Sequence, residues 1–120
     1  MQAIRLNDLT NLRYNDDYTI RSIVERLSQY SVIHNVILFG SRARGTHRDD
    51  SDTDVMIITE TDIPFDEELW SFFEAINERN GTDVRISPIS VAEWNNPTYE
   101  ESIEIRQNIY NEGIIIADYI

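Results

Sequence analysis

Apolar side chains recur along this chain in patterns that predict alternating helices and strands. Five apolar positions repeat at helical spacing within residues 19–30, so this segment is expected to form an amphipathic helix with Thr19 as its N-cap. A run of branched and aromatic residues over 32–39, closed by Gly40, is typical of a largely buried strand. Residues 52–59 predict a second buried strand.

The second half of the chain continues this alternation. Pro64 stands where a first-turn proline begins a helix, and the apolar spacing carries that helix to about Asn80. Residues 82–89 predict a third strand, which Pro88 places at a sheet edge or ends. A helix over 97–111 and a short strand over 114–116 follow. The predicted fold class is therefore α/β (α+β), a single compact domain with a small mixed β-sheet packed against helices.

The N-terminal stretch differs in composition from the rest. Residues 1–17 are too polar for a core element, so they are interpreted as an arm of uncertain order that precedes a domain over residues 18–120. The start of the chain lacks the apolar core of a secretion signal, and no apolar run is long enough to span a membrane. A cytoplasmic protein that does not bind membranes is expected.

Composition and charge exclude several kinds of chemistry. The 120 residues include no cysteine, which excludes zinc–thiolate sites, iron–sulfur clusters and thiol catalysis. All ten basic residues are arginine, so Schiff-base chemistry on lysine is excluded as well. The 22 acidic residues give a formal charge of −12, which argues against a nucleic-acid duplex as partner because duplexes are bound largely by neutralising phosphates.

The loop over residues 40–52 holds the first candidate binding groups. Gly40 and Gly45 have the spacing of the two Walker A glycines, but Thr46 stands where that motif requires lysine, so a P-loop is excluded. A glycine–serine turn after a strand can still offer backbone N–H groups and the Ser41 hydroxyl to phosphate oxygens. The guanidinium groups of Arg42 and Arg44 are candidates to bind a polyphosphate.

Aspartates supply the candidate metal ligands. Asp52 and Asp54 are two residues apart in a predicted strand, so their side chains point to one face with Cα atoms about 6.5 Å apart. That separation suits two Mg²⁺ ions, which sit about 3.5 to 4 Å apart in phosphoryl-transfer enzymes. Asp83 begins the next predicted strand and joins the pair if the two strands are neighbours. It could then complete a metal shell and accept a proton from an attacking hydroxyl.

These residues resemble the minimal nucleotidyltransferases of the DNA polymerase beta-like superfamily. The resemblance rests on Gly40-Ser41-x-Ala43-Arg44-Gly45, on Asp52-x-Asp54 after the expected interval, and on the strand-borne Asp83, and it extends from about Tyr18 to the end. It implies Mg²⁺-dependent transfer of AMP from ATP to a hydroxyl. Gly40 and Ser41 would bind the triphosphate, Asp52 and Asp54 the metal ions, and Asp83 would assist metal binding and activate the acceptor.

The resemblance also implies a partner. Small members of the family are typically encoded beside a HEPN-domain ribonuclease, and they act as antitoxins that adenylylate a tyrosine on it or bind it. Two other functions stay open at this point: a non-catalytic module that neutralises its partner by occlusion, and an adenylyltransferase for a small molecule such as an aminoglycoside. Arg85 is a candidate to orient Asp83, and Trp94 and Tyr99 are candidates to contact a partner or an adenine.

Overall fold

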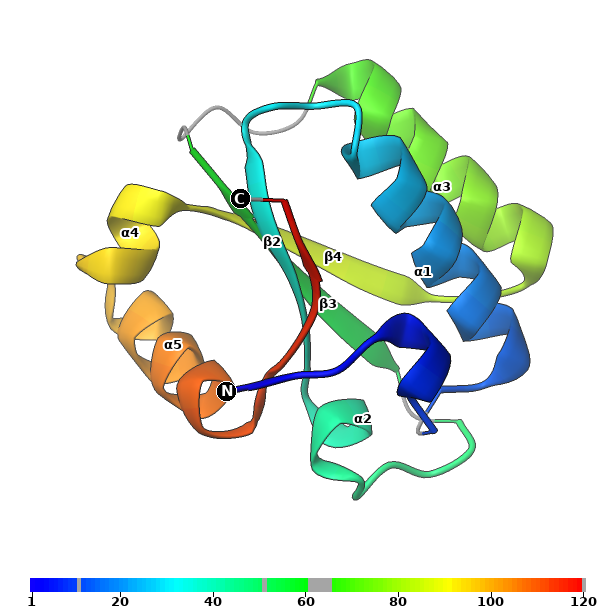
Figure 1. Ribbon diagram of the computed structural model, residues 1–120, viewed down its shortest axis with the longest axis horizontal. Coiled ribbons are helices and arrows are strands. Elements are labelled where there is room, and N and C mark those ends of the chain that lie inside the picture. The colour runs from blue at the N-terminus through cyan, green and yellow to red at the C-terminus, as the bar shows by residue number, and fades with distance from the viewer. Residues whose placement is uncertain (11, 51, 61–65, 120) are drawn as a thin grey trace.

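A mixed sheet of five strands forms the centre of the molecule, between two groups of helices (Figure 1). The computed structural model describes residues 1–10, 12–50, 52–60 and 66–119. The strands are β1 (Gln2–Ala3), β2 (Ile33–Phe39), β3 (Thr53–Thr59), β4 (Val84–Ser90) and β5 (Ile114–Asp118). The helices are α1 (Tyr14–Leu27), α2 (Ser41–Arg44), α3 (Glu67–Asn80), α4 (Val91–Asn95) and α5 (Glu100–Glu112), with a 3-10 turn η1 (Leu6–Asp8).

The sheet has the order β1-β5-β2-β3-β4. β2 pairs antiparallel with both β3 and β5, whereas β3 pairs parallel with β4, and β1 pairs parallel with β5. The end of β2 therefore meets the beginnings of β3 and β4 at one end of the sheet. This is the end from which the predicted phosphate loop and the predicted carboxylates emerge.

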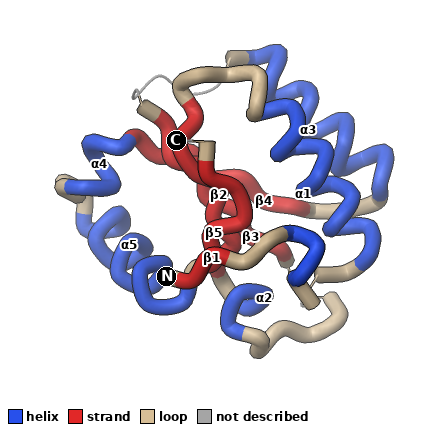
Figure 2. The backbone as a smooth tube through the Cα atoms, viewed as in Figure 1, coloured by secondary structure: helices blue, strands red, loops and turns tan. Residues whose placement is uncertain are grey.

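Each face of the sheet is covered by a separate pair of helices (Figure 2). On one face α1 and α3 pack their buried side chains, such as Ile20 and Phe73, into the larger hydrophobic core. On the other face Trp94 of α4 and Ile109 of α5 pack against Met56 and its neighbours in a smaller core. Alternation of side chains along each strand supplies apolar groups to both cores.

The predicted fold class, a small mixed sheet packed against helices, is confirmed, and the strand that contains Pro88 lies at the sheet edge as predicted. Two short helices were not predicted, because α2 and α4 span too few residues to show a helical period. Pro64 lies outside the described residues. In the described part α3 begins at Glu67, and the Asp66 side chain caps it by accepting a hydrogen bond from the Leu69 N–H at 2.8 Å.

The first long helix begins at Tyr14, five residues before the predicted start. Its buried face includes two polar side chains, Asp16 and Thr19, ahead of the apolar positions, and these interrupt the hydrophobic period that marks a helix in the sequence. The predicted N-terminal arm thus contains β1, η1 and the first turn of α1. Its leucines, among them Leu6 and Leu9, pack against the larger core.

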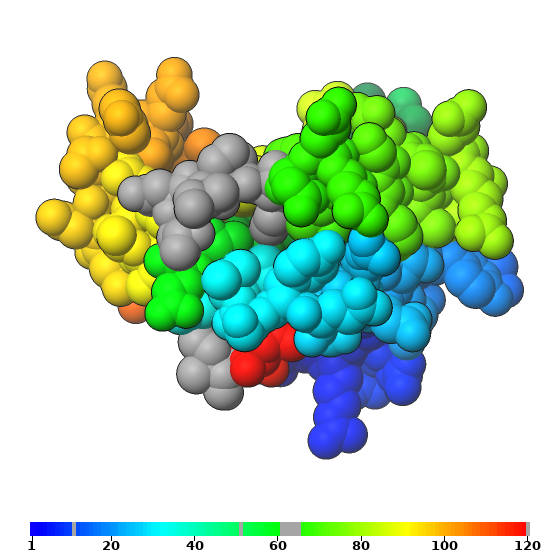
Figure 3. Space-filling view, turned by 90° about the horizontal axis from the view of Figure 1, so that it is seen from above, coloured from blue at the N-terminus to red at the C-terminus, as the bar shows by residue number. Residues whose placement is uncertain are grey.

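Figure 3 shows α3 (green) and α4 (yellow) standing on opposite sides of the molecule. Among the described residues, no helix combines the length and the apolar character that crossing a membrane requires.

Candidate active site

The parallel pairing of β3 with β4 brings the predicted carboxylates to one place. Thr53 is the register partner of Val84, and Asp54 is the partner of Arg85. Because residues two apart on a strand share a face, Asp52 and Asp83 lie on the same face as this pair, at the start of their strands. The condition on which Asp83 was predicted to join the site, that the two strands are sheet neighbours, is therefore met.

Arg85 connects the two outer carboxylates. Its Nη2 lies 3.1 Å from Asp52 Oδ2, and its Nε lies 3.7 Å from Asp83 Oδ2. All three side chains are substantially exposed, with 59% of the Arg85 side chain accessible, so these ion pairs contribute little to stability. They do hold a cation among the carboxylates and so reduce the repulsion between them.

Asp54 occupies a different environment from its two neighbours. It is partly buried, and burial raises the pKa of its carboxyl above the ordinary value. The Arg85 charge lowers that pKa, while the negative charges of Asp52 and Asp83 raise it further. Among the described residues none donates a hydrogen bond to the Asp54 carboxylate. Asp54 is thus a desolvated carboxylate that a cation would stabilise.

The turn between β2 and α2 lies directly against Asp54. Gly40 has φ +77° and ψ −159°, a conformation that is essentially restricted to glycine. A Cβ atom at this position would lie 2.8 Å from Asp54 Oδ2. The absence of a side chain therefore permits the turn and also makes room for the carboxylate, which brings the predicted phosphate-binding turn and the Asp-x-Asp motif into contact. Ser41 follows as the first residue of α2 and is partly buried.

The two arginines of the loop lie in different places. Arg42 is 3% exposed, and its Nη2 donates a hydrogen bond to the Asp49 carbonyl at 3.2 Å, so it supports the loop from beneath. Arg44 is exposed and pairs with Glu112 of α5 at 3.2 Å. Of the two guanidinium groups predicted to bind a polyphosphate, that of Arg44 is accessible and that of Arg42 is buried.

A cavity of about 190 Å³ lies beside the Gly40 turn. It is lined by Phe39, Gly40 and Arg44 on one side and by residues of α5, including Ile105 and Ile109, on the other. The cavity combines an apolar wall with a guanidinium group. Its composition suits a flat organic group attached to a phosphate.

The donor set fits a hard divalent cation, although the three carboxylates are not gathered as a cluster. No group of three or more metal-binding side chains is arranged to hold an ion within the described ranges. Asp52 and Asp54 nevertheless supply carboxylate oxygens of the kind that Mg²⁺ prefers, and no residue in the described part of the chain donates a hydrogen bond to Asp54. In the structure it is Arg85 that forms ion pairs with Asp52 and Asp83.

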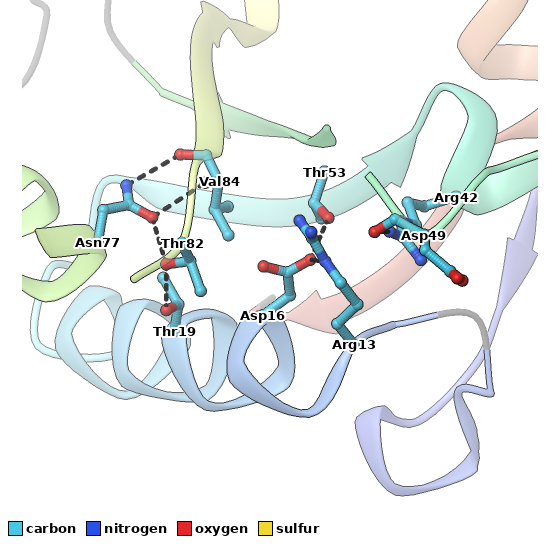
Figure 4. A network of polar contacts seen from close by, with 9 residues as sticks. All are labelled: Arg13, Asp16, Thr19, Arg42, Asp49, Thr53, Asn77, Thr82 and Val84. Carbon is cyan, nitrogen blue, oxygen red and sulfur yellow. Dashed lines mark hydrogen bonds and ion pairs between the residues drawn. The ribbon is translucent and has the colours of Figure 1, made fainter. Parts of the chain in front are cut away.

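Two residues close to the site, Asp16 and Asn77, could not have been identified from the sequence pattern. Asp16 of α1 accepts a hydrogen bond from Thr53, the residue between Asp52 and Asp54 (Figure 4). Asn77 of α3 is bonded to Thr82 and Val84, the two neighbours of Asp83. Asp16 falls in the segment predicted to be an arm, and Asn77 is one polar residue among many on a helix.

The two aromatic candidates separate in the structure. Trp94 is 8% exposed, and its ring stacks on Tyr110 with centroids 6.3 Å apart, so it is a core residue and the prediction that it contacts a partner or an adenine is wrong. Tyr99 is 70% exposed. It is the N-cap residue of α5, a helix that carries further exposed apolar side chains, including Ile103 in its first half and Tyr110 near its C-terminal end.

Comparison with known proteins matches this chain to one family and to several solved structures. Residues 21–119 match the family model for polymerase beta nucleotidyltransferases. A toxin–antitoxin crystal structure with AMP-PNP aligns with a TM-score of 0.57 and 15% identity, over 88% of this chain and 74% of that one. A variant of the toxin–antitoxin pair MntA–HpeT aligns with a TM-score of 0.54 and 17% identity, over 89% and 73% of the two chains.

A third structure, a protein from Sulfolobus solfataricus described as a nucleotidyltransferase, aligns with a TM-score of 0.50 and 18% identity over 89% of each chain. No curated protein sequence matches. The identities are low, so the likeness to these solved structures concerns the fold.

Proposed function

The chain belongs to the polymerase beta nucleotidyltransferase family, and we propose that it transfers AMP from ATP to a hydroxyl group on a partner protein. One observation carries this proposal. The register of β3 with β4 places Asp52, Asp54 and Asp83 on one face at the end of the sheet where the Gly40 turn contacts Asp54. Carboxylates beside a phosphate-binding turn are the parts that phosphoryl transfer requires.

Each residue has a defined part in the reaction. Ser41 and the backbone of the Gly40 turn bind the triphosphate, and Arg44 contributes positive charge at the edge of the cavity. The acceptor oxygen bonds to the α-phosphorus while the bond from that phosphorus to the bridging oxygen breaks, which releases pyrophosphate. Asp83 is 70% exposed and accepts the proton of the acceptor hydroxyl. Arg42 holds the loop and does not contact the nucleotide.

The proposed cofactor is Mg²⁺, as two ions. Asp52 and Asp54 would hold them, with Asp83 as a further ligand after Arg85 leaves its ion pairs. Bound there, Mg²⁺ neutralises the charge on the α-phosphate and on the departing pyrophosphate. Asp54 benefits most from a cation because burial and the charges of its neighbours disfavour its ionised form.

The proposed partner is a toxin, specifically a HEPN ribonuclease whose tyrosine accepts AMP, which makes this protein an antitoxin. The fold neighbours from toxin–antitoxin complexes support this proposal, as does the net charge of −12, which complements a basic RNA-binding protein. The exposed side of α5 supports it as well. α5 buries Ile109 within the described structure, yet Tyr99, Ile103 and Tyr110 are each at least half exposed.

The test of the activity is transfer of label from ATP that is radioactive at the α-phosphate. The purified protein is incubated with Mg²⁺ and a lysate of its source organism, beside Asp54→Asn and a matched surface variant, Asp8→Asn. We expect a labelled protein band with the wild type and with Asp8→Asn, and none with Asp54→Asn. Mass spectrometry of the band identifies the modified side chain.

Other outcomes favour the alternative functions. Label in a small molecule would identify a metabolite or drug as acceptor. If wild type and Asp54→Asn both protect growing cells from the partner, and neither transfers label, the protein acts by occlusion and the proposed enzymatic role is wrong. The comparison is informative because occlusion does not require the carboxylates, whereas transfer does.

A further inference from the structure

The proposed metal-binding carboxylates are held from behind by a second set of polar side chains. Along β3, Asp52 and Asp54 face the site, so the intervening Thr53 faces the opposite side of the sheet, where α1 and α3 lie. Thr53 is fully buried. The same alternation at the start of β4 turns Val84 toward the helices.

Asp16 holds the start of β3. Its Oδ2 accepts a hydrogen bond from the Thr53 hydroxyl at 2.9 Å and from Arg13 Nε at 3.0 Å (Figure 4). Asp16 is 1% exposed, and its Oδ1 accepts no hydrogen bond from the described residues. A buried carboxylate with one oxygen unpaired is an unfavourable choice for stability alone, because an apolar side chain of similar size avoids the desolvation of the charge.

Asn77 holds the start of β4. Its Oδ1 accepts a hydrogen bond from the Val84 N–H at 2.9 Å, and its Nδ2 donates one to the Val84 carbonyl at 3.1 Å. β4 is an edge strand, so these two backbone groups have no neighbouring strand to pair with on their outer side. The Thr82 hydroxyl donates to the same Oδ1 at 2.8 Å. The residues on both sides of Asp83 are therefore fixed by one side chain of α3.

We infer that Asp16 and Asn77 are positioning residues, which hold the two strand starts that carry the proposed metal-binding carboxylates. Mg²⁺ demands near-octahedral oxygen ligands, so the backbone that presents the ligands must be placed accurately. Asp52 and Asp83 have exposed side chains that can reorient, whereas the backbone beneath them is tied to two helices. Removal of a side chain that hydrogen-bonds directly to a metal ligand typically changes metal affinity about 10–100-fold. Asp16 and Asn77 act one step further out, through the ligands' neighbours in the chain, so the lower end of that range applies to them.

This inference rests on the proposed function. Binding of Mn²⁺ alone, measured by electron paramagnetic resonance, tests the inference and the proposed metal site separately. We expect Asp16→Leu and Asn77→Ala to bind Mn²⁺ about tenfold more weakly than the wild type. Asp16→Asn keeps an oxygen acceptor for the Thr53 hydroxyl, so it should bind within about threefold of the wild type. Urea unfolding in the presence of a chelator should show a loss of stability for Asp16→Leu, because the fully buried Thr53 hydroxyl then has no acceptor, and the Asp16→Leu/Thr53→Val double variant, which removes both partners, should recover most of that loss.

A matched control separates positioning from general destabilisation. Tyr119→Phe removes a hydrogen bond of similar length, from the Tyr119 hydroxyl to the Val24 carbonyl at 2.8 Å, between β5's end and α1. It should leave Mn²⁺ affinity unchanged. If Asp16→Leu does not fold, Thr53→Val serves instead. It removes the same hydrogen bond from the β3 side with little change in volume, and it should weaken Mn²⁺ binding to the same extent.

The possible failures are distinguishable. If the wild type binds Mn²⁺ in an Asp54-dependent manner while Asp16→Leu, Thr53→Val and Asn77→Ala all bind within about twofold of it, the positioning role is overturned and the proposed function stands. If the wild type itself does not bind Mn²⁺, the proposed metal site fails, and the inference fails with it. A raised Mg²⁺ requirement for AMP transfer by Asn77→Ala, with the maximal rate recovered at high Mg²⁺, would support the inference by a second readout.

Discussion

Substitution of Gly40 by alanine tests the contact between the proposed phosphate-binding turn and the Asp54 carboxylate. The φ and ψ angles of Gly40, +77° and −159°, lie in a region that costs a residue with a side chain about 1–3 kcal/mol. The new Cβ would stand 2.8 Å from Asp54 Oδ2, so the carboxylate must retreat by roughly half an ångström to reach an ordinary contact distance. A side chain forced off its rotamer costs about 0.5–1.5 kcal/mol more. The expected loss of stability is therefore about 2–4 kcal/mol.

Gly81 provides the matched control for this substitution. It has φ +63° and ψ 37°, and a Cβ there would meet nothing within 4 Å. Gly81→Ala should cost about 1–2 kcal/mol, from the left-handed conformation alone. Both substitutions reduce the entropy of the unfolded chain equally, so this contribution cancels in the comparison. The difference between the two variants therefore contains the contact with Asp54 together with the larger backbone cost at Gly40.

The assay is urea unfolding with a chelator present, combined with Mn²⁺ binding. Linear extrapolation gives the free energy of unfolding of each variant. Gly40→Ala should be about 1–2 kcal/mol less stable than Gly81→Ala and should lose Mn²⁺ affinity, because the displaced carboxylate is a proposed ligand. Equal stability losses, with Mn²⁺ affinity unchanged in Gly40→Ala, would refute the argument that this glycine makes room for Asp54.

Four further results are expected. The folded-state pKa of Asp54 is raised, so its ionised form destabilises the metal-free protein above the unfolded pKa of about 3.9. Asp54→Asn should therefore be more stable than the wild type at pH 7 in urea unfolding, and the difference in unfolding free energy should shrink as the pH falls through the folded pKa. Arg85→Gln removes the cation that competes for the carboxylates, so Mn²⁺ binding without nucleotide should strengthen severalfold at low salt, and unchanged affinity would mean that Arg85 does not compete. Arg42→Met removes a buried donor to the loop backbone and should speed limited proteolysis within residues 45–50 relative to Arg5→Met, a change at an exposed residue outside the loop. Burial raises the pKa of Tyr119 to about 12, so its phenol favours the fold less as the pH rises from about 10 to about 12; ultraviolet titration should show a tyrosine ionising near this pH that is lost in Tyr119→Phe.

The sequence was sufficient to predict the elements whose pattern is local. β2 and β3 were predicted from runs of apolar residues because both of their faces are buried, and α3 from its apolar stripe. The start of α1 was misplaced because Asp16 occupies a core-facing position, and a buried carboxylate cannot be distinguished from a solvated one in a sequence. α4 was missed because five residues are too few for a period.

The candidate site divides in the same way. Gly40 with Ser41, and Asp52 with Asp54, are neighbours along the chain, so the fixed geometry of a turn and of a strand was enough to predict that each pair acts together. Asp83 required the additional knowledge that β3 and β4 are parallel neighbours. The contrast between buried Arg42 and exposed Arg44 depends on which way the short helix α2 turns, and this is set by packing.

By itself, the sequence determined the order of the longer helices and strands, the glycine–serine turn, the Asp-x-Asp pair and the family, because these follow from local periodicity and from spacings of a few residues. Only the tertiary structure decided which segments that are distant in the sequence come into contact. Gly40 lies against Asp54, Arg85 pairs with both Asp52 and Asp83, and Asp16 accepts a hydrogen bond from Thr53. Such contacts depend on sheet order and helix packing, which sum many weak interactions across the whole chain. Local propensity carries no information about that sum, so the supports of the site became visible only once the chain was folded.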